Sequence, residues 1–180
     1  MVLNFPLTTT SLPPSTALAM YRERLVDYSV PDQMIRGSHD SSNIVRQMFR
    51  PIKSGQFNIK AKPNVVFANE AGIDADGLTR ELCHMVMATL QDGKGGVQLF
   101  EGKTDHLIPV HNEEYIASHY FEYVGKLIGH SVIHAGFGLV GLSRAIAMYL
   151  ISEDIDSCLT HLLVEDIPDF DLQNHIREVK

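Results

Sequence analysis

Hydrophobic residues recur at helical spacing in two long stretches of the chain, residues 78–90 and 113–135. In both, apolar side chains return every three or four positions, which places them on one face of a helix. These positions are Leu78, Leu82, Met85, Val86 and Leu90 in the first stretch, and Ile116, Tyr120, Phe121, Val124, Leu127, Ile128 and Val132 in the second. The pattern predicts helices over both stretches, and shorter helices over 17–28, 42–49 and 142–151.

Short strands are predicted between these helices. Residues 57–61 alternate apolar and polar side chains, the two-residue period of a half-buried strand. Short apolar runs at 65–67 and 97–100 predict two more strands. Pro31 and the polar stretch 37–42 predict a loop between the first two helices. The predicted fold class is therefore α+β, mainly helical with short β-strands.

Polar residues mark the starts of the two long helices. Asp74 or Asp76 is placed to accept hydrogen bonds from the first turn of the 78–90 helix, and Asn112 from the first turn of the 113–135 helix. Residues 1–16 are polar, proline-bearing and without periodicity, which predicts a flexible lead-in. The remaining residues, 17–180, are predicted to form a single domain.

Composition narrows the classes of protein that the pattern allows. The 180 residues suffice for one core, and neither a membrane span nor a secretory signal is apparent. Two cysteines, Cys83 and Cys158, give no disulfide framework, which favours an intracellular compartment. Residues 21–62 hold eight Lys or Arg against four Asp or Glu, whereas residues 63–180 hold seven against eighteen. An acidic body disfavours nucleic acid as a partner.

Gly136-Phe-Gly-Leu-Val-Gly141 matches the dinucleotide-binding pattern G-x-G-x-x-G. That motif requires a preceding strand, so that the glycines turn sharply and the pyrophosphate meets the next helix. Here the residues before the glycines continue a helical pattern, which predicts a loop between two helices. A nucleotide-dependent oxidoreductase is the alternative, and it would need a strand at 116–134.

His130 and His134 lie one turn apart on the predicted central helix. A metalloprotease of the H-E-x-x-H type would carry a glutamate at Ser131, so that mechanism is not supported. The histidines that could supply a third ligand are His106, His111 and His119. With nine histidines in the chain, a chance pair is the favoured interpretation, and no metal or cofactor is predicted.

The remaining candidates for catalysis lack the groups that would activate them. Ser143 is predicted to start a helix. Cys83 and His84 are neighbours on a helix, so they point about 100° apart, and Cys83 is predicted to be buried. Cys158 has His161 three residues on, but no third group orients the pair. The sequence therefore predicts no catalytic, cofactor-binding or metal-binding residue.

Two segments of the chain carry motifs that occur together, in this order, in one known family. In residues 65–81, the matching positions are Phe67, Glu70, Gly72, Asp74, Gly77, Arg80 and Glu81. In residues 120–134, they are Phe121, Gly125, Lys126, Gly129 and His134. With these motifs the chain resembles the HECT-type ubiquitin-protein ligases, with the G2/M-phase-specific type among the candidates. The first of the family's paired glycines is replaced by Asp76.

The resemblance continues between and after these segments. Leu99 and Phe100 resemble the family's Leu-Phe strand, and residues 142–149 resemble the helix after its glycine loop. Matching positions run from about 57 to 163. Gly125 and Gly129, four apart on one helix, are expected to let another element approach its backbone closely.

The resemblance implies a two-lobed protein in the ubiquitin-conjugation pathway. The family's N-lobe recruits a charged ubiquitin-conjugating enzyme, and its C-lobe carries a cysteine that accepts ubiquitin as a thioester. This chain is expected to be the N-lobe portion, truncated before the conjugating-enzyme-binding subdomain and the C-lobe. Neither Cys83 nor Cys158 matches the catalytic position. The chain alone is thus expected to be inactive.

The partners implied are a ubiquitin-conjugating enzyme and ubiquitin, both through the parent protein. Self-association of the fragment through uncovered apolar surface is a further expectation. Localisation is expected to be cytoplasmic or nuclear, with no membrane or nucleic-acid partner. The first alternative is a degenerate HECT-like module that serves protein–protein interaction without ligase chemistry.

Overall fold

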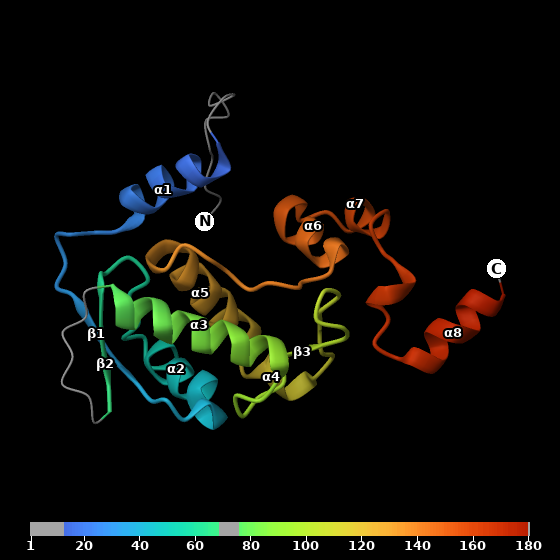
Figure 1. The fold of residues 1–180 in the computed structure, drawn as a ribbon, viewed down its shortest axis with the longest axis horizontal. Helices are drawn as coiled ribbons and strands as arrows, with labels where there is room; N and C mark the ends of the chain where they lie inside the picture. The colour runs from blue at the N-terminus through green and yellow to red at the C-terminus, as the bar shows by residue number, and fades with distance from the viewer. Residues whose placement is uncertain (1–12, 69–75, 180) are drawn as a thin grey trace.

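A computed structural model describes residues 13–68 and 76–179 of the protein. The fold is α+β and mainly helical, as predicted (Figure 1). The helices are α1 (Pro14–Leu25), α2 (Ile44–Lys53), α3 (Gly77–Asp92), α4 (Glu113–Ala117), α5 (Tyr120–His134), α6 (Arg144–Ser152), α7 (Ile155–Leu159) and α8 (Phe170–Glu178). Two 3-10 turns are η1 (Ser41–Asn43) and η2 (Val164–Asp166). The strands are β1 (Gln33–Gly37), β2 (Pro63–Phe67), β3 (Phe100–Glu101) and β4 (Ile108–Pro109).

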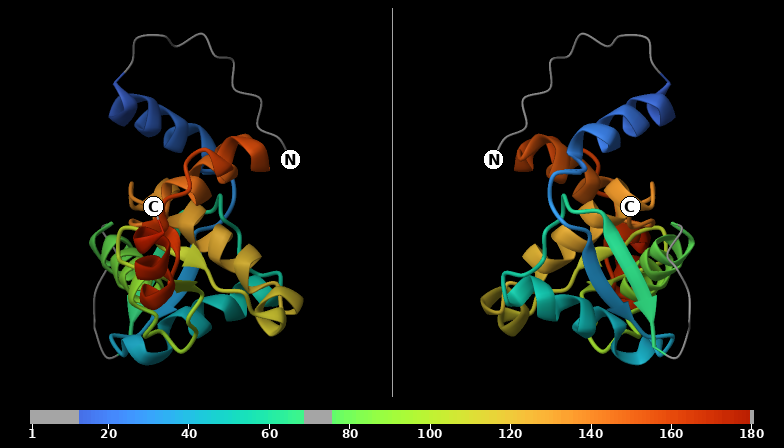
Figure 2. Two further views of the ribbon diagram at one scale, coloured as in Figure 1. Left: turned by 90° about the vertical axis from the view of Figure 1, so that its right-hand side faces the viewer. Right: turned by 90° about the vertical axis from the view of Figure 1, so that its left-hand side faces the viewer.

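The strands of the described ranges pair into two small sheets. β1 runs parallel to β2, with Ile35 opposite Val65, and β3 runs antiparallel to β4. Parallel strands cannot be joined by a tight turn, so the connection from β1 to β2 crosses over through α2. Figure 2 shows β1 and β2 side by side. β2 confirms the predicted strand at 65–67.

β1 was not predicted, because residues 37–42 and Pro31 indicated only a loop. In this strand Ile35 and Gly37 are buried, whereas Met34 and Arg36 are exposed. A strand with one buried apolar side chain gives too short an alternation to stand out from a loop. The structure therefore corrects the prediction at residues 33–37.

The hydrophobic core lies between α2, α3, α5 and the β1–β2 sheet. α3 buries Leu82, Val86 and Leu90, as its apolar spacing predicted, and α5 adds Val124 and Leu127. Fully burying an aliphatic side chain of this size stabilises the fold by about 1.5 to 3 kcal/mol. The other buried apolar members are Ile35, Ile44, Val45, Met48, Phe49, Ile52, Val65, Phe67, Met87, Val97, Leu99, Phe100 and Leu107.

Residues 57–61 form no strand, contrary to the prediction. They form a loop and turn that pack against α5. The Phe57 ring lies 5.2 Å from the ring of His130, and a Cβ on Gly129 would lie 3.2 Å from Ile59 Cδ1. The alternation of apolar residues was a real burial signal. However, these apolar side chains pack against helix α5, and the segment does not pair with a strand.

The predicted helix over 113–135 is broken into α4 and α5. Asn112 caps α4 as predicted, since its side-chain oxygen accepts from the Tyr115 amide at 3.1 Å. The break falls at His119, which has a left-handed φ of 59°. It lets the Tyr115 and Tyr120 rings stack with centroids 5.4 Å apart.

Other element boundaries moved by a few residues. α1 begins at Pro14, inside the segment predicted as a flexible lead-in, whereas residues 1–12 lie outside the described ranges. β3 covers Phe100–Glu101 and not all of 97–100. Asp76 precedes α3 with a φ of 69° and makes no side-chain cap hydrogen bond. Asp74 lies outside the described residues.

Helices α6 to α8 extend from the core toward one end of the molecule (Figure 1). Asp166, in η2 between α7 and α8, joins this region to the β3–β4 connection. His106 Nδ1 in that connection lies 2.7 Å from Asp166 Oδ1. Lys103 Nζ lies 5.2 Å from the centre of the Phe170 ring. Several large apolar side chains here are exposed: Tyr149, Leu150, Ile151, Ile155, Leu159, Leu162, Leu163, Phe170 and Leu172.

Candidate functional site

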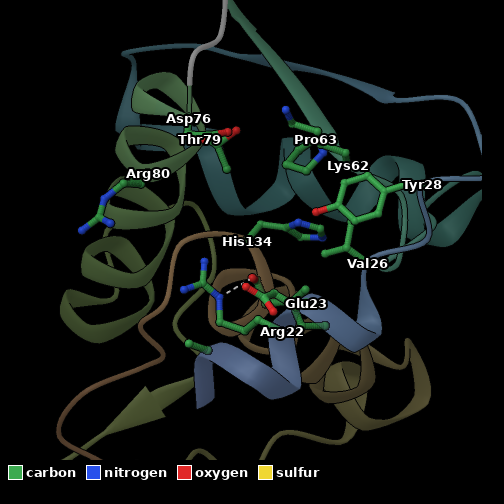
Figure 3. A pocket seen from close by; sticks show the side chains of 12 residues that line it. Arg22, Glu23, Val26, Tyr28, Lys62, Pro63, Asp76, Thr79, Arg80 and His134 are labelled. Atoms are coloured by element: carbon green, nitrogen blue, oxygen red, sulfur yellow. Dashed lines mark hydrogen bonds between the residues drawn. The ribbon is translucent and has the colours of Figure 1, made fainter. Parts of the chain in front are cut away.

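A cavity of about 360 Å³ lies between α1, the first turn of α3 and the end of α5. Figure 3 shows Arg22 and Glu23 rising from α1 on one side, and Asp76 and Thr79 at the start of α3 on the other. His134, the last residue of α5, lies between them. The cavity therefore brings together three segments that are far apart in the sequence.

Arg22 ties α1 to the end of α5. Its Nε donates to the carbonyl oxygen of Ile133 at 2.6 Å. A cation at a helix C-terminus is stabilised by the unsatisfied carbonyl groups there. Gly136 makes room for this contact, because it has a φ of 86° and an added Cβ would lie 2.9 Å from Arg22 Nη1. α1 buries no residue of its own, and this hydrogen bond joins it to the end of α5.

His134 ties α5 to the 57–61 loop. Its Nε2 lies 2.9 Å from the carbonyl oxygen of Ile59. A carbonyl oxygen only accepts, so the bond assigns the proton of the neutral ring to Nε2. Burial, and to a lesser degree the nearby Arg22, lowers the pKa of His134, while the bond to Ile59 raises it. The net effect favours the neutral ring as a hydrogen-bond donor.

The charges around the cavity are mixed. Arg22, Lys62 and Arg80 are positive, and Glu23 and Asp76 are negative. Arg80 extends away from the centre of the cavity (Figure 3). The hydroxyl groups that line it belong to Tyr28 and Thr79, and no cysteine is among its described lining residues. This chemistry suits structural ties between helices and offers no thiol for a transfer reaction.

Behind the cavity, His130 and Cys83 lie in the core. Cys83 is buried, as predicted, and its Sγ lies 4.0 Å from His130 Nδ1. The His130 ring is 4.6 Å from the His134 ring, and His130 Nε2 has no hydrogen-bond partner among residues 13–68 and 76–179. Burial, and to a lesser degree His134, lowers the pKa of His130 from its usual 6.5 to about 3. A neutral imidazole cannot stabilise a thiolate as a cation would.

Acid should weaken the fold through His130. Because its folded pKa of about 3 lies below its unfolded value, the unfolded chain takes up the proton first as the pH falls. The contribution of neutral His130 to the free energy of unfolding is therefore fully present above about pH 6.5, and it is lost progressively as the pH falls from 6.5 to 3. At pH 4 we expect a loss of about 3 kcal/mol from this residue. Urea unfolding at pH 7 and pH 4 measures it.

The matched variant is His130→Phe, which removes the titrating group and keeps a ring at this position. Its free energy of unfolding should fall less between pH 7 and pH 4 than that of the unmodified chain. The exposed His111 supplies the surface control: the pH dependence of His130→Phe is compared with that of His111→Gln. Equal pH dependence in His130→Phe and the unmodified chain would contradict the assignment.

The glycine loop at Gly136–Gly141 joins α5 to α6, as predicted. Residues 120–134 form a helix, so the strand that a dinucleotide motif requires is not at that place. Gly141 has a φ of 93° and lies against the carbonyl of Thr104. Ser143 caps α6, with its hydroxyl accepting from the Ile146 amide at 3.3 Å. These residues fix a turn between helices, which removes the basis of the oxidoreductase alternative.

The histidines considered as metal ligands are dispersed. His106 is paired with Asp166, His119 lies at the α4–α5 break with its Nδ1 3.7 Å from Glu122, and His111 is exposed. Within residues 13–68 and 76–179, no group of three or more His, Cys, Asp or Glu side chains is arranged to hold a metal ion. His130 and His134 have the separate roles described above.

Cys158 lies in the short helix α7. Its Sγ donates to the carbonyl oxygen of Ile155 at 3.0 Å, and His161 follows the end of the helix. Asp154 caps this helix by accepting from the amides of Asp156 and Ser157, both at 3.2 Å. The polar groups around Cys158 therefore serve the helix, and no described contact orients His161 toward the thiol.

The residues that carry the family resemblance occupy different settings. Phe67 is buried in β2, and Arg80 and Glu81 lie exposed in the first turns of α3. Of the two helix glycines, Gly129 faces Ile59, but Gly125 has no atom within 4 Å of an added Cβ, so the expected close approach there is wrong. Glu70, Gly72 and Asp74 lie outside the described residues.

Two residues that make the hydrogen bonds beside the cavity were not singled out by the sequence. Arg22 and Ile59 are bonded to residues 111 and 75 positions away. The sequence around Arg22 does not indicate that its side chain binds a distant backbone carbonyl group. The only local signal was Gly136, whose positive φ shows that the chain there needs a glycine.

A scan against models of known protein families and a search of curated proteins each found no match. None of the helices in the described part of the chain has the length and apolar character needed to cross a membrane.

Proposed function

We propose that the chain is the N-lobe portion of a HECT-type ubiquitin-protein ligase. In this proposal it is a scaffold that positions a ubiquitin-conjugating enzyme and a cysteine-bearing lobe in a longer protein of the cytoplasm or nucleus. The chain by itself performs no ubiquitin transfer. Its contribution to protein ubiquitination is to hold other parts in place.

One observation carries the proposal. Arg80, from the first family-like segment, and His134, from the second, line the same cavity although 54 positions separate them in the sequence. Motifs that belong to one functional unit are expected to meet in space, whereas chance matches have no reason to do so. This supports interpreting the two segments as parts of one signature.

The settings of the two cysteines agree with a scaffold role. A thiol that accepts ubiquitin must be accessible and readily ionised. Cys83 is 4% exposed and lies in the core beside a neutral histidine, and Cys158 donates to a helix carbonyl. The exposed apolar side chains of α6 to α8 give a surface on which another part of a larger protein could pack.

A thioester assay tests the proposal. The chain is incubated with ubiquitin, ATP, an activating enzyme and a conjugating enzyme, beside the parent protein extended beyond Lys180. We expect an adduct that thiol reagents reverse on the parent and none on the chain alone. An adduct on Cys83 or Cys158 would overturn the scaffold role. An inactive parent would point instead to a protein-interaction module without ligase chemistry.

A further inference from the structure

The outer edge of β1 has backbone groups that β2 does not use. Gln33 donates its amide to the Lys62 carbonyl at 2.8 Å, and the Gly37 carbonyl accepts from the Ala68 amide at 3.2 Å. In a parallel pair, alternate residues direct both backbone groups to the same neighbour. The N–H and C=O groups of Met34 and Arg36 therefore point away from β2.

Among the described residues, these outward groups lie beside a groove and not against another strand. No hydrogen bond joins the backbone of Met34 or Arg36 to a described residue on that side. The side chain of Met34 is 62% exposed. A free strand edge of this kind is a template on which an extended segment can add as a further strand.

A groove runs along this edge. It has a volume of about 340 Å³ and is bounded by residues 33–36 of β1 on one side and by α2 on the other. Its size is within the range of about 300 to 1,000 Å³ that is usual for binding pockets. Met48 and Phe57 give it apolar walls, so a bound strand would find both backbone partners and a hydrophobic contact.

The charge of the groove selects the chemistry of its occupant. Arg36, from β1, and Arg50, from α2, are exposed and line it, and no carboxylate is among its described lining residues. Neither guanidinium has an ion-pair partner among the described residues. Guanidinium groups bind carboxylates through paired hydrogen bonds. Acidic side chains on a bound segment could therefore pair with Arg36 on one wall of the groove and with Arg50 on the other.

We propose that this groove binds an extended acidic peptide segment of a partner protein, which adds to the free edge of β1 as a third strand. The segment presents backbone groups to Met34 and Arg36, apolar side chains to Met48 and Phe57, and carboxylates to Arg36 and Arg50. This role is independent of the proposed ligase function, and it holds whether or not the parent protein carries ubiquitin.

Synthetic peptides test the backbone part of the proposal on the full chain. The probe is a fluorescent peptide that alternates valine and glutamate, and its control alternates valine and lysine. Fluorescence anisotropy should show at least about tenfold tighter binding of the glutamate peptide, with the difference shrinking as salt is raised. N-methylation of alternate residues should abolish binding in one register and spare it in the other, because only one set of amides faces β1.

Charge reversal tests the side-chain part. The double variant Arg36→Glu and Arg50→Glu should weaken binding of the glutamate peptide at least about tenfold. Lys53→Glu, on the same helix but outside the groove lining, is the matched control and should have little effect. Circular dichroism confirms that each variant is folded.

Four results would overturn the proposal: no binding of the glutamate peptide at millimolar concentration, equal binding of the lysine peptide, equal effects of both N-methylation registers, or unchanged binding by the double variant. Tighter binding of a single-stranded oligonucleotide than of the acidic peptide would also overturn it, because it would assign the groove to phosphate groups. The peptide series keeps the test decisive even if a protein variant fails to fold.

Discussion

Replacing Gly141 by alanine should destabilise the protein by about 3 to 5 kcal/mol. Gly141 has a φ of 93°, a backbone conformation that residues other than glycine rarely adopt. An added Cβ would also overlap the carbonyl oxygen of Thr104. That oxygen belongs to the backbone and cannot move aside as a side chain would. The loop cannot shift freely either, because the Leu107 amide donates to the Gly141 carbonyl at 2.8 Å. Urea unfolding measures the loss.

Gly125→Ala is the matched control for that substitution. Gly125 lies on an exposed face of α5 with open space around an added Cβ. Alanine there should stabilise the protein by about 0.5 to 1 kcal/mol, since glycine loses more conformational freedom in a helix. If Gly141→Ala were as well tolerated as Gly125→Ala, the close contact at Thr104 would not be a feature of the folded protein in solution.

Replacing His106 by leucine should release the C-terminal segment from the body. Asp166 is 4% exposed, and its carboxyl group has His106 and the Leu163 amide as its partners. Without the histidine, a buried carboxyl loses one of these two partners, at a cost of about 2 to 4 kcal/mol. We expect hydrogen exchange in α8 to accelerate strongly, while exchange in α3 stays slow.

The exposed His111 again provides a control of the same chemical change. His111→Leu should leave exchange in α8 as it is in the unmodified chain. Unchanged protection of α8 in His106→Leu would mean that the contact of Lys103 with the Phe170 ring holds the segment to the body instead. Limited proteolysis after residue 163 gives an independent reading of the same release.

The parts of the fold that the sequence predicted best are those with a long helical period. α3 repeats its apolar positions over four turns, and its interior residues are buried as expected. The same period failed at His119, where the chain adopts a left-handed φ between the stacked rings of Tyr115 and Tyr120 and no local pattern marks the break. Residues 57–61 show a different limit. Alternation reports which side chains are buried but not whether their neighbour is a strand or a helix.

The cavity could be predicted only in part. His134 was singled out as half of a histidine pair and as a family-like residue, but its partner Ile59 accepts through a backbone oxygen, which any residue could supply. The bond from Arg22 to Ile133 has the same character. A contact from a side chain to a distant backbone group cannot be predicted from the residue type of the acceptor, because every residue has a backbone carbonyl group. The anchoring of α1 therefore emerged from the structure alone.

The arrangement of β1, α2, β2 and α3 has a consequence for how the chain folds. These four elements occupy residues 33–92 and pack directly on one another, since β1 pairs with β2, β2 contacts α3, and α2 contacts α3. Contacts between segments close in sequence form faster than distant ones, because less chain entropy is lost in closing the loops. We expect this part of the chain to collapse first, and during synthesis to do so while α5 is still emerging from the ribosome. α5 would then dock onto a surface that already exists.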